Sequence, residues 1–168
     1  MVKALVRPAG AADLAAIEAV HLASARAAFA SIGPVERLAA RDWAADLAAA
    51  EAALVAVDDD SSVVGFAFVG GCELQFFYTH PGVWGRGFGR ALLGAASDAL
   101  AAAGCTEAFV YTEERNTRAL AVYRADGWRP DGAVKERSWL GVPIREPRLV
   151  KRLPRGLNVE PRRADDAC

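Results

Sequence analysis

The chain has 168 residues, a formal net charge of -1 and a sequence pI of about 6.1. This length fits one domain with a sizeable core, and the charge balance offers no basic field of the kind that attracts nucleic acid. No apolar run is long enough to span a membrane, and the N-terminal residues MVKALVRP lack the apolar segment of a secretory signal. We therefore expect a cytoplasmic protein that binds neither nucleic acid nor membrane.

The cysteines Cys72, Cys105 and Cys168 are odd in number and widely spaced. This pattern indicates neither a disulfide framework nor a zinc site, so we expect no metal. Cys72 has no basic partner nearby in sequence to activate a thiolate, which favours a structural role over a nucleophilic one.

The first third of the chain alternates short strands with helical patterns. A strand is predicted for Lys3–Arg7, which Pro8 closes, and apolar residues at near-helical spacing then predict a helix from Asp13 to Phe29. A break at residues 31–34 precedes a second predicted helix, Val35–Ala50, which carries an apolar stripe. Two strands follow as a hairpin across a polar turn, at 53–57 and 63–69.

The middle of the chain reads as a strand, a turn, a glycine-rich loop and a helix. Aromatic residues at 76–78 favour a pleated strand, and His80-Pro81-Gly82 ends it with a turn. The sequence then predicts a helix over 91–100, a strand over 106–112, a helix over 116–126 and two strands between Trp128 and Leu153. This order predicts an α/β (α+β) fold in which a mixed sheet carries helices on both faces. Residues 154–168 are charged, and we expect them to form a tail outside a domain at 1–153.

The loop Gly85-Arg86-Gly87-Phe88-Gly89-Arg90 opens the helix that follows it. Three alternate glycines leave backbone N–H groups uncovered at a helix start, where unpaired donors and the positive end of the peptide dipoles already favour an anion. Arg86 and Arg90 add formal positive charge. The loop therefore predicts a binding site for an anion, most plausibly a pyrophosphate.

Spacing narrows the choice of pyrophosphate ligand. In the dinucleotide pattern G-x-G-x-x-G the third glycine position holds Arg90 or Leu92, depending on the starting glycine, and the nucleotide-triphosphate pattern G-x-x-x-x-G-K-[ST] is absent. The loop instead resembles motif A of the GCN5-related N-acetyltransferases, the GNAT family, whose pattern is Gln or Arg, two residues, Gly, one residue, then Gly or Ala. Trp84 takes the first position here, so a side-chain donor of the amide or guanidinium kind is missing.

A second segment resembles GNAT motif B, with its markers at Asn116, Ala119, Tyr123, Gly127 and Trp128. Both motifs stand in the order and at the separation found in the family, and the resemblance covers residues 2–153. It implies a mostly antiparallel sheet with splayed central strands and a site for acetyl-CoA as acyl donor.

The resemblance also implies roles for individual residues. Tyr123 is expected to protonate the leaving thiolate, and Glu73, at the start of the motif A strand, is the candidate base that takes the proton from the amine, directly or through water. The residues expected to contact the donor are Phe77, Tyr78, Thr79, Trp84, Gly85, Arg86, Gly87, Phe88, Gly89, Arg90, Asn116 and Tyr123. For His21, in the first predicted helix, we expect a partly buried, hydrogen-bonded side chain.

Three functions remain open at this stage. The first is transfer of an acetyl group to the primary amine of a small molecule by direct attack in a ternary complex. The second is acetylation of a protein or peptide N-terminus, and the third is a catalytically silent module that binds coenzyme A. Dimers are frequent in the family, so a homodimer is one expected state.

Overall fold

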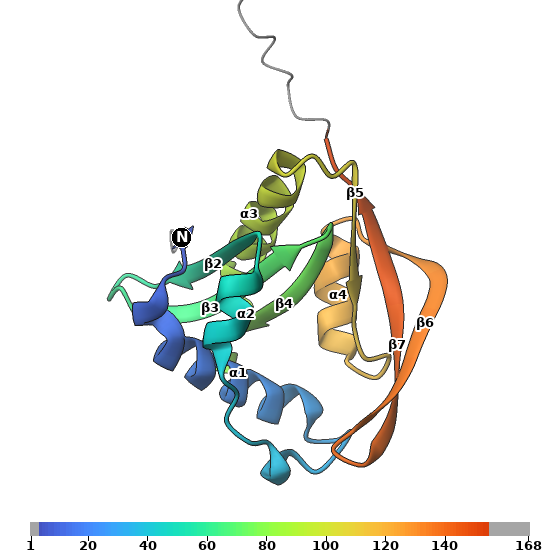
Figure 1. The fold of residues 1–168 in the computed structure, drawn as a ribbon. Coiled ribbons are helices and arrows are strands. Elements are labelled where there is room, and N and C mark those ends of the chain that lie inside the picture. The colour runs from blue at the N-terminus through green and yellow to red at the C-terminus, as the bar shows by residue number, and fades with distance from the viewer. Residues whose placement is uncertain (1–3, 155–168) are drawn as a thin grey trace, which may run out of the picture.

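A seven-stranded sheet organises the computed structural model, which describes residues 4–154 (Figure 1). The strand order is β1-β2-β3-β4-β5-β7-β6, and every neighbouring pair is antiparallel except β4 and β5. The strands are β1 Leu5–Pro8, β2 Ala52–Val57, β3 Val63–Gly70, β4 Glu73–Thr79, β5 Glu107–Tyr111, β6 Arg129–Trp139 and β7 Val142–Arg152. The helices are α1 Leu14–Phe29, α2 Trp43–Ala49, α3 Phe88–Ala102 and α4 Thr117–Ala125. The predicted fold class and order of elements are confirmed, while the tail predicted at 154–168 lies outside the described residues apart from Pro154.

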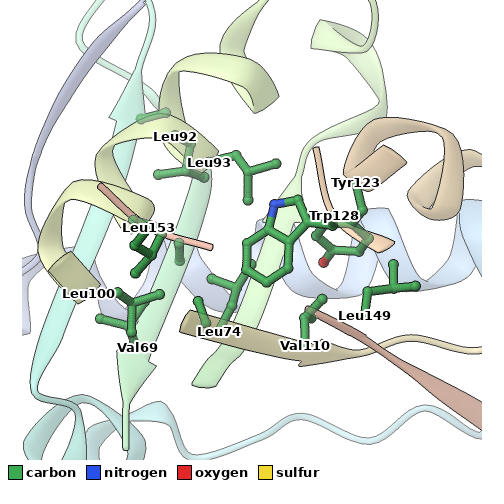
Figure 2. Close-up of a cluster of buried hydrophobic side chains, with 14 of the residues drawn as sticks. Val69, Leu74, Leu92, Leu93, Leu100, Val110, Tyr123, Trp128, Leu149 and Leu153 are labelled. Carbon is green, nitrogen blue, oxygen red and sulfur yellow. The ribbon is translucent and has the colours of Figure 1, made fainter. Parts of the chain in front are cut away.

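Helices cover both faces of the sheet, as predicted. On one face α1 and α2 bury Ile17, Val20 and Trp43 against the aromatic side chains of β3. On the other face α3 and α4 pack over a second apolar cluster, in which Trp128 is fully buried (Figure 2). Figure 2 shows Tyr123 at one side of this cluster, beside Trp128. The cluster therefore fixes the ring of Tyr123 relative to the sheet.

The parallel strands β4 and β5 meet at one end only. Their ladder consists of the pair Glu73 and Phe109, next to a hydrogen bond from the Phe109 N–H to the Cys72 carbonyl oxygen at 3.0 Å. Beyond Glu73 the edge of β4 that faces β5 has no strand partner, and a register shift against β3 leaves Gln75 as the extra residue of a β-bulge. The splayed central strands expected from the resemblance are confirmed.

The prediction of one continuous helix over Val35–Ala50 is wrong. Residues 35–37 form a single 3-10 turn, the chain is then extended at Leu38, and α2 begins only at Trp43. Asp42 caps the helix by accepting a hydrogen bond from the Ala44 N–H at 2.9 Å. The break lets Trp43, which is 2% exposed, turn into the aromatic cluster of the sheet.

The expectation that the cysteines form no disulfide is also wrong. Cys72 and Cys105 are bonded across 33 residues, and the bond joins the β3–β4 turn to the segment before β5. The bond therefore lies at the end where β4 and β5 still pair, beside their single ladder pair, and not in the gap where the two strands diverge, which we call the splay. The cysteine pattern consequently gives no support to a reducing compartment.

We expect reduction of this disulfide to lower stability substantially. In the chain-entropy model a bond that closes a loop of this length stabilises by about 3–4 kcal/mol, which corresponds to a Tm loss of roughly 10 °C in a domain of this size. Thermal unfolding followed by circular dichroism, with and without a phosphine reductant, measures the loss. The double variant Cys72→Ser, Cys105→Ser should start at the lower Tm and not respond to the reductant. An equal Tm for all four samples would contradict the assigned role.

Candidate active site

The glycine-rich loop between β4 and α3 adopts a conformation that exposes its backbone. Gly85 and Gly87 have φ angles of 77° and 94°, which L side chains rarely adopt, and a Cβ built on either would meet no atom within 4 Å. Gly87 is the N-cap residue of α3, so the helix begins at Phe88, three residues before its predicted start. The free N–H groups of the first turn therefore border open space.

Two adjoining cavities extend from this loop into the splay between β4 and β5. The loop groove, of about 630 Å³, lies between the loop, the start of α3 and one side of α4. The central cleft, of about 180 Å³, lies between β4, β5, α1, α4 and the β6–β7 hairpin. Phe77, Thr79, Trp84, Arg118 and Val122 line both, so the two cavities adjoin along these five residues.

The structure brings most of the predicted donor-binding residues to the walls of these two cavities. The loop groove is lined by Phe77, Thr79, Trp84, Gly85, Gly87, Gly89 and Arg90, and the central cleft by Phe77, Tyr78, Thr79, Trp84, Asn116 and Tyr123. Arg86 and Phe88 line neither cavity. Phe88 is fully buried in the core, so only its backbone can face a ligand.

Trp84, the residue that departs from the family pattern, makes one hydrogen bond through its ring nitrogen and one stacking contact through its ring face. Its Nε1 donates a hydrogen bond to the Thr79 carbonyl oxygen at 3.0 Å, and the Arg118 Cζ lies 4.0 Å from the centre of its ring. This stacking places a guanidinium from α4 on the wall of both cavities. The sequence did not predict this contact, because Trp84 and Arg118 are 34 positions apart.

Tyr123 is buried where α4 meets β4. Its ring centre lies 5.8 Å from that of Phe77 and 5.9 Å from that of Trp128, and the residue is 4% exposed. Burial, and to a smaller extent the neighbouring Tyr78, raise the pKa of Tyr123 far above its ordinary value. The phenol is therefore protonated at neutral pH.

Asn116 has a structural task in addition to its place on the cleft wall. Its Oδ1 accepts a hydrogen bond from the Ala119 N–H at 3.1 Å and so caps α4. Its side-chain amide nitrogen takes no part in this cap.

Glu73 is not brought to either cavity. It is the first residue of β4, at the closed end of the splay, where it pairs with Gly70 on one side and Phe109 on the other. Its role as the base stays a prediction.

Glu113 and His21 are among the ionisable residues of the central cleft to which the sequence assigned no catalytic role. Glu113 is 2% exposed, and its two oxygens accept hydrogen bonds from the backbone N and the Nε of Arg115 at 2.6 and 2.7 Å. His21 lies on α1, and contrary to expectation its Nδ1 is buried without a hydrogen-bond partner. No pattern local to either residue predicts a catalytic role, because only the fold brings these elements together.

Residues 4–154 contain no group of three or more His, Cys, Asp or Glu side chains that could hold a metal ion. In the same range no helix is both long and apolar enough to cross a membrane.

Comparison with solved structures supports the architecture. A GCN5-related N-acetyltransferase from Rhodopseudomonas palustris aligns with a TM-score of 0.74 at 21% identity, over 91% of this chain and 98% of that one. A GNAT superfamily phosphinothricin acetyltransferase from Sinorhizobium meliloti, solved in complex with acetyl-CoA, aligns with a TM-score of 0.72 at 20% identity, over 96% and 94%. At these identities the similarity shows the fold.

Sequence relatives cover a shorter stretch. A mycothiol acetyltransferase from Clavibacter michiganensis subsp. michiganensis is 40% identical over 85 residues, which is 48% of this chain and 28% of the relative. The matched stretch thus covers about a quarter of the relative's length. The model of the Acetyltransferase (GNAT) family matches residues 17–128, a range that contains the loop, the splay and Tyr123. On this evidence the chain belongs to the GNAT acetyltransferase family.

Proposed function

We propose that this protein transfers an acetyl group from acetyl-CoA to the primary amine of a small molecule, by direct attack in a ternary complex. The observation that carries the proposal is the pair of adjoining cavities, one at the glycine-rich loop and one between β4 and β5, with Tyr123 on the wall of the second. Acetyl-CoA supplies an activated acetyl thioester, and the chain supplies the sites that hold it. The loop groove has the backbone donors and the Arg90 charge that a diphosphate requires.

The unpaired edge of β4 fits the rest of the donor. Main-chain N–H and C=O groups between Gln75 and Thr79 lack a strand partner on the β5 side. Such groups favour an extended ligand with peptide-like amides, which can pair with them as a strand would. A thioester at the far end of this ligand would lie in the central cleft near Tyr123, whose retained proton can pass to the leaving sulfur.

The size of the central cleft and the curated relatives both favour a small acceptor. About 180 Å³ is less than a typical drug-sized site, and the relatives are named for acetylation linked to mycothiol, a small molecule. The cleft wall away from the loop mixes apolar and charged side chains: Phe29 and Trp139 are in contact at 5.1 Å between ring centres, and Arg137 pairs with Glu146 at 2.8 Å. An amine on a compact, partly apolar body fits this wall better than a protein chain.

The direct test is release of coenzyme A thiol from acetyl-CoA across a panel of small amines and N-terminal peptides, with mass spectrometry of the acceptor. The proposal expects acetylation of a small amine. Acetylation of peptides alone would support the N-terminal alternative. Coenzyme A binding without thiol release would support the silent module.

We expect Arg118→Gln to weaken the use of acetyl-CoA about tenfold. A hydrogen bond to a charged group contributes about 1.5 kcal/mol or more, which is roughly a factor of ten in Kd or in kcat/KM. The loss should be absent with S-acetylpantetheine, a donor without the diphosphate. Arg124→Gln, which removes an exposed charge from the same helix outside both cavities, is the matched control. An equal loss with both donors would contradict a role at the diphosphate.

A further inference from the structure

His21 stands on the α1 side of the central cleft, with its ring fixed on two sides. Its ring centre lies 5.0 Å from that of Trp43 and 5.1 Å from that of Tyr78, and both contacts are edge-to-face. The same cleft is lined by Tyr123 from α4, on the opposite face of the sheet. A proton acceptor and a proton donor are thus available on the two sides of one cavity.

The buried nitrogen of His21 faces an oriented carboxylate. Nδ1 forms no hydrogen bond of good geometry, but the Glu18 Oε2 lies 3.5 Å from it, close enough for its negative charge to act on the ring. Glu18 is held in place because its Oε2 accepts from the Trp43 Nε1 at 2.6 Å and its Oε1 from the Arg41 N–H at 3.0 Å. A carboxylate on this side favours a proton on Nδ1, which leaves the lone pair on Nε2.

The surroundings also keep the imidazole neutral. Burial lowers the pKa of His21 below its ordinary value of 6.5, and Glu18 opposes this shift only in part. The other titratable or charged groups that face the ring are Arg41, before α2, and Tyr78 on β4. Arg41 is itself paired with Asp46 through two hydrogen bonds of 2.9 Å. At neutral pH the ring is therefore free to accept a proton.

From this geometry we propose that His21 Nε2 is the general base that takes the proton from the acceptor amine, with Glu18 as its positioning residue. This inference rests on the proposed function and assigns the base to α1 rather than to Glu73. The amine nitrogen bonds to the acetyl carbon, the carbon–sulfur bond breaks, and His21 gains the proton that the nitrogen loses. Tyr123 gives its hydroxyl proton to the sulfur, and solvent returns a proton from His21 to Tyr123.

The kinetic test compares His21→Asn with wild type. Asparagine can place its amide N–H near the position of Nδ1, but it has no atom at Nε2. We expect kcat to fall about 100-fold or more, since general base catalysis contributes a factor of this order. Acetyl-CoA binding measured by calorimetry should be unchanged. In wild type kcat should fall as the pH drops below the pKa of His21, because only the neutral ring is a base, and this limb should be missing in the variant.

The competing assignment to Glu73 gives the opposite pattern. If Glu73→Gln removes the acid limb while His21→Asn retains it together with full kcat, the inference is overturned. His80→Asn is the matched control, because His80 lines neither cavity and an asparagine can still accept the hydrogen bond from the Gly82 N–H that His80 Nδ1 accepts at 3.1 Å. The proposed function is tested independently of these variants, by the release of coenzyme A thiol when wild type is given an amine.

A second readout does not depend on turnover. The chain contains two histidines, so ¹⁵N spectra of histidine-labelled protein can be assigned with the His80→Asn variant. We expect His21 at pH 7.5 to be neutral, with its proton on Nδ1. A proton on Nε2, or a charged ring at this pH, would overturn the inference even if activity were lost in the variant for another reason.

Discussion

The variant Tyr123→Phe should retain its affinity for acetyl-CoA and lose about 100-fold or more in kcat. The ring contacts with Phe77 and Trp128 involve carbon atoms that phenylalanine keeps, so the core should pack as before. Only the hydroxyl is removed, and with it the proton for the leaving thiolate, a contribution in the range typical of general acid catalysis. Steady-state kinetics and calorimetry on the same preparation separate the two effects.

A matched deletion of a hydroxyl is available at Tyr111 on β5. Tyr111 also lines the central cleft, and Lys135 Nζ lies 3.6 Å from its ring centre. Tyr111→Phe should leave kcat within about twofold of wild type if proton donation belongs to Tyr123 alone. Because the pKa of Tyr123 is raised so far, its titration should not shape the rate profile near neutral pH. Full activity in Tyr123→Phe would remove the assignment.

The second large effect is expected for Gly89→Val, which should abolish measurable binding of coenzyme A without unfolding the domain. Gly89 lies in the first turn of α3 and has no positive φ, and a Cβ there would meet Phe77 and Thr79 at 3.7 and 3.8 Å, which are ordinary contact distances. The valine methyl groups would occupy the loop groove beside the free N–H groups. Loss of two hydrogen bonds to a charged diphosphate raises Kd by a factor of about 100 or more.

Gly94→Val is the control in the same helix. A Cβ at Gly94 meets no atom within 4 Å, and the residue lines neither cavity. Valine there should preserve binding, and its higher helix propensity should preserve or raise the Tm. Gly87→Val is less informative, because the φ of 94° would strain any side chain regardless of the ligand. Binding by Gly89→Val at wild-type affinity would place the diphosphate elsewhere.

Local patterns were sufficient to predict the order of the elements and the loop. Some signals determine structure only in the residues next to them, so they can be read from the sequence directly. Examples are the aromatic run of β4, the glycines before α3 and the Asn116 cap of α4. The boundaries of α2 were harder to predict. Ala-rich sequence favours helix throughout 35–50, whereas burial of Trp43, a tertiary effect, decides where the helix begins.

Features that depend on pairs distant in sequence could not be predicted. An odd number of cysteines hides the bond between Cys72 and Cys105, because parity says nothing about which two lie close together. The stacking of Arg118 on Trp84 and the position of His21 beside Tyr78 depend equally on how α1 and α4 pack onto β4. Sequence patterns can suggest donor-binding residues through a family motif, but residues supplied from other elements emerge only once the chain is folded.

The single ladder pair between β4 and β5 makes the sheet two half-sheets, β1–β4 and β5–β7–β6, within one domain. A molecule bound between β4 and β5 contacts both half-sheets at once. Because it binds only the folded protein, its binding raises the free energy of unfolding. At a concentration 100 times its Kd, such a molecule adds about 2.7 kcal/mol to the free energy of unfolding. An acyl donor bound in this space would then stabilise the folded domain as well as serve as a substrate.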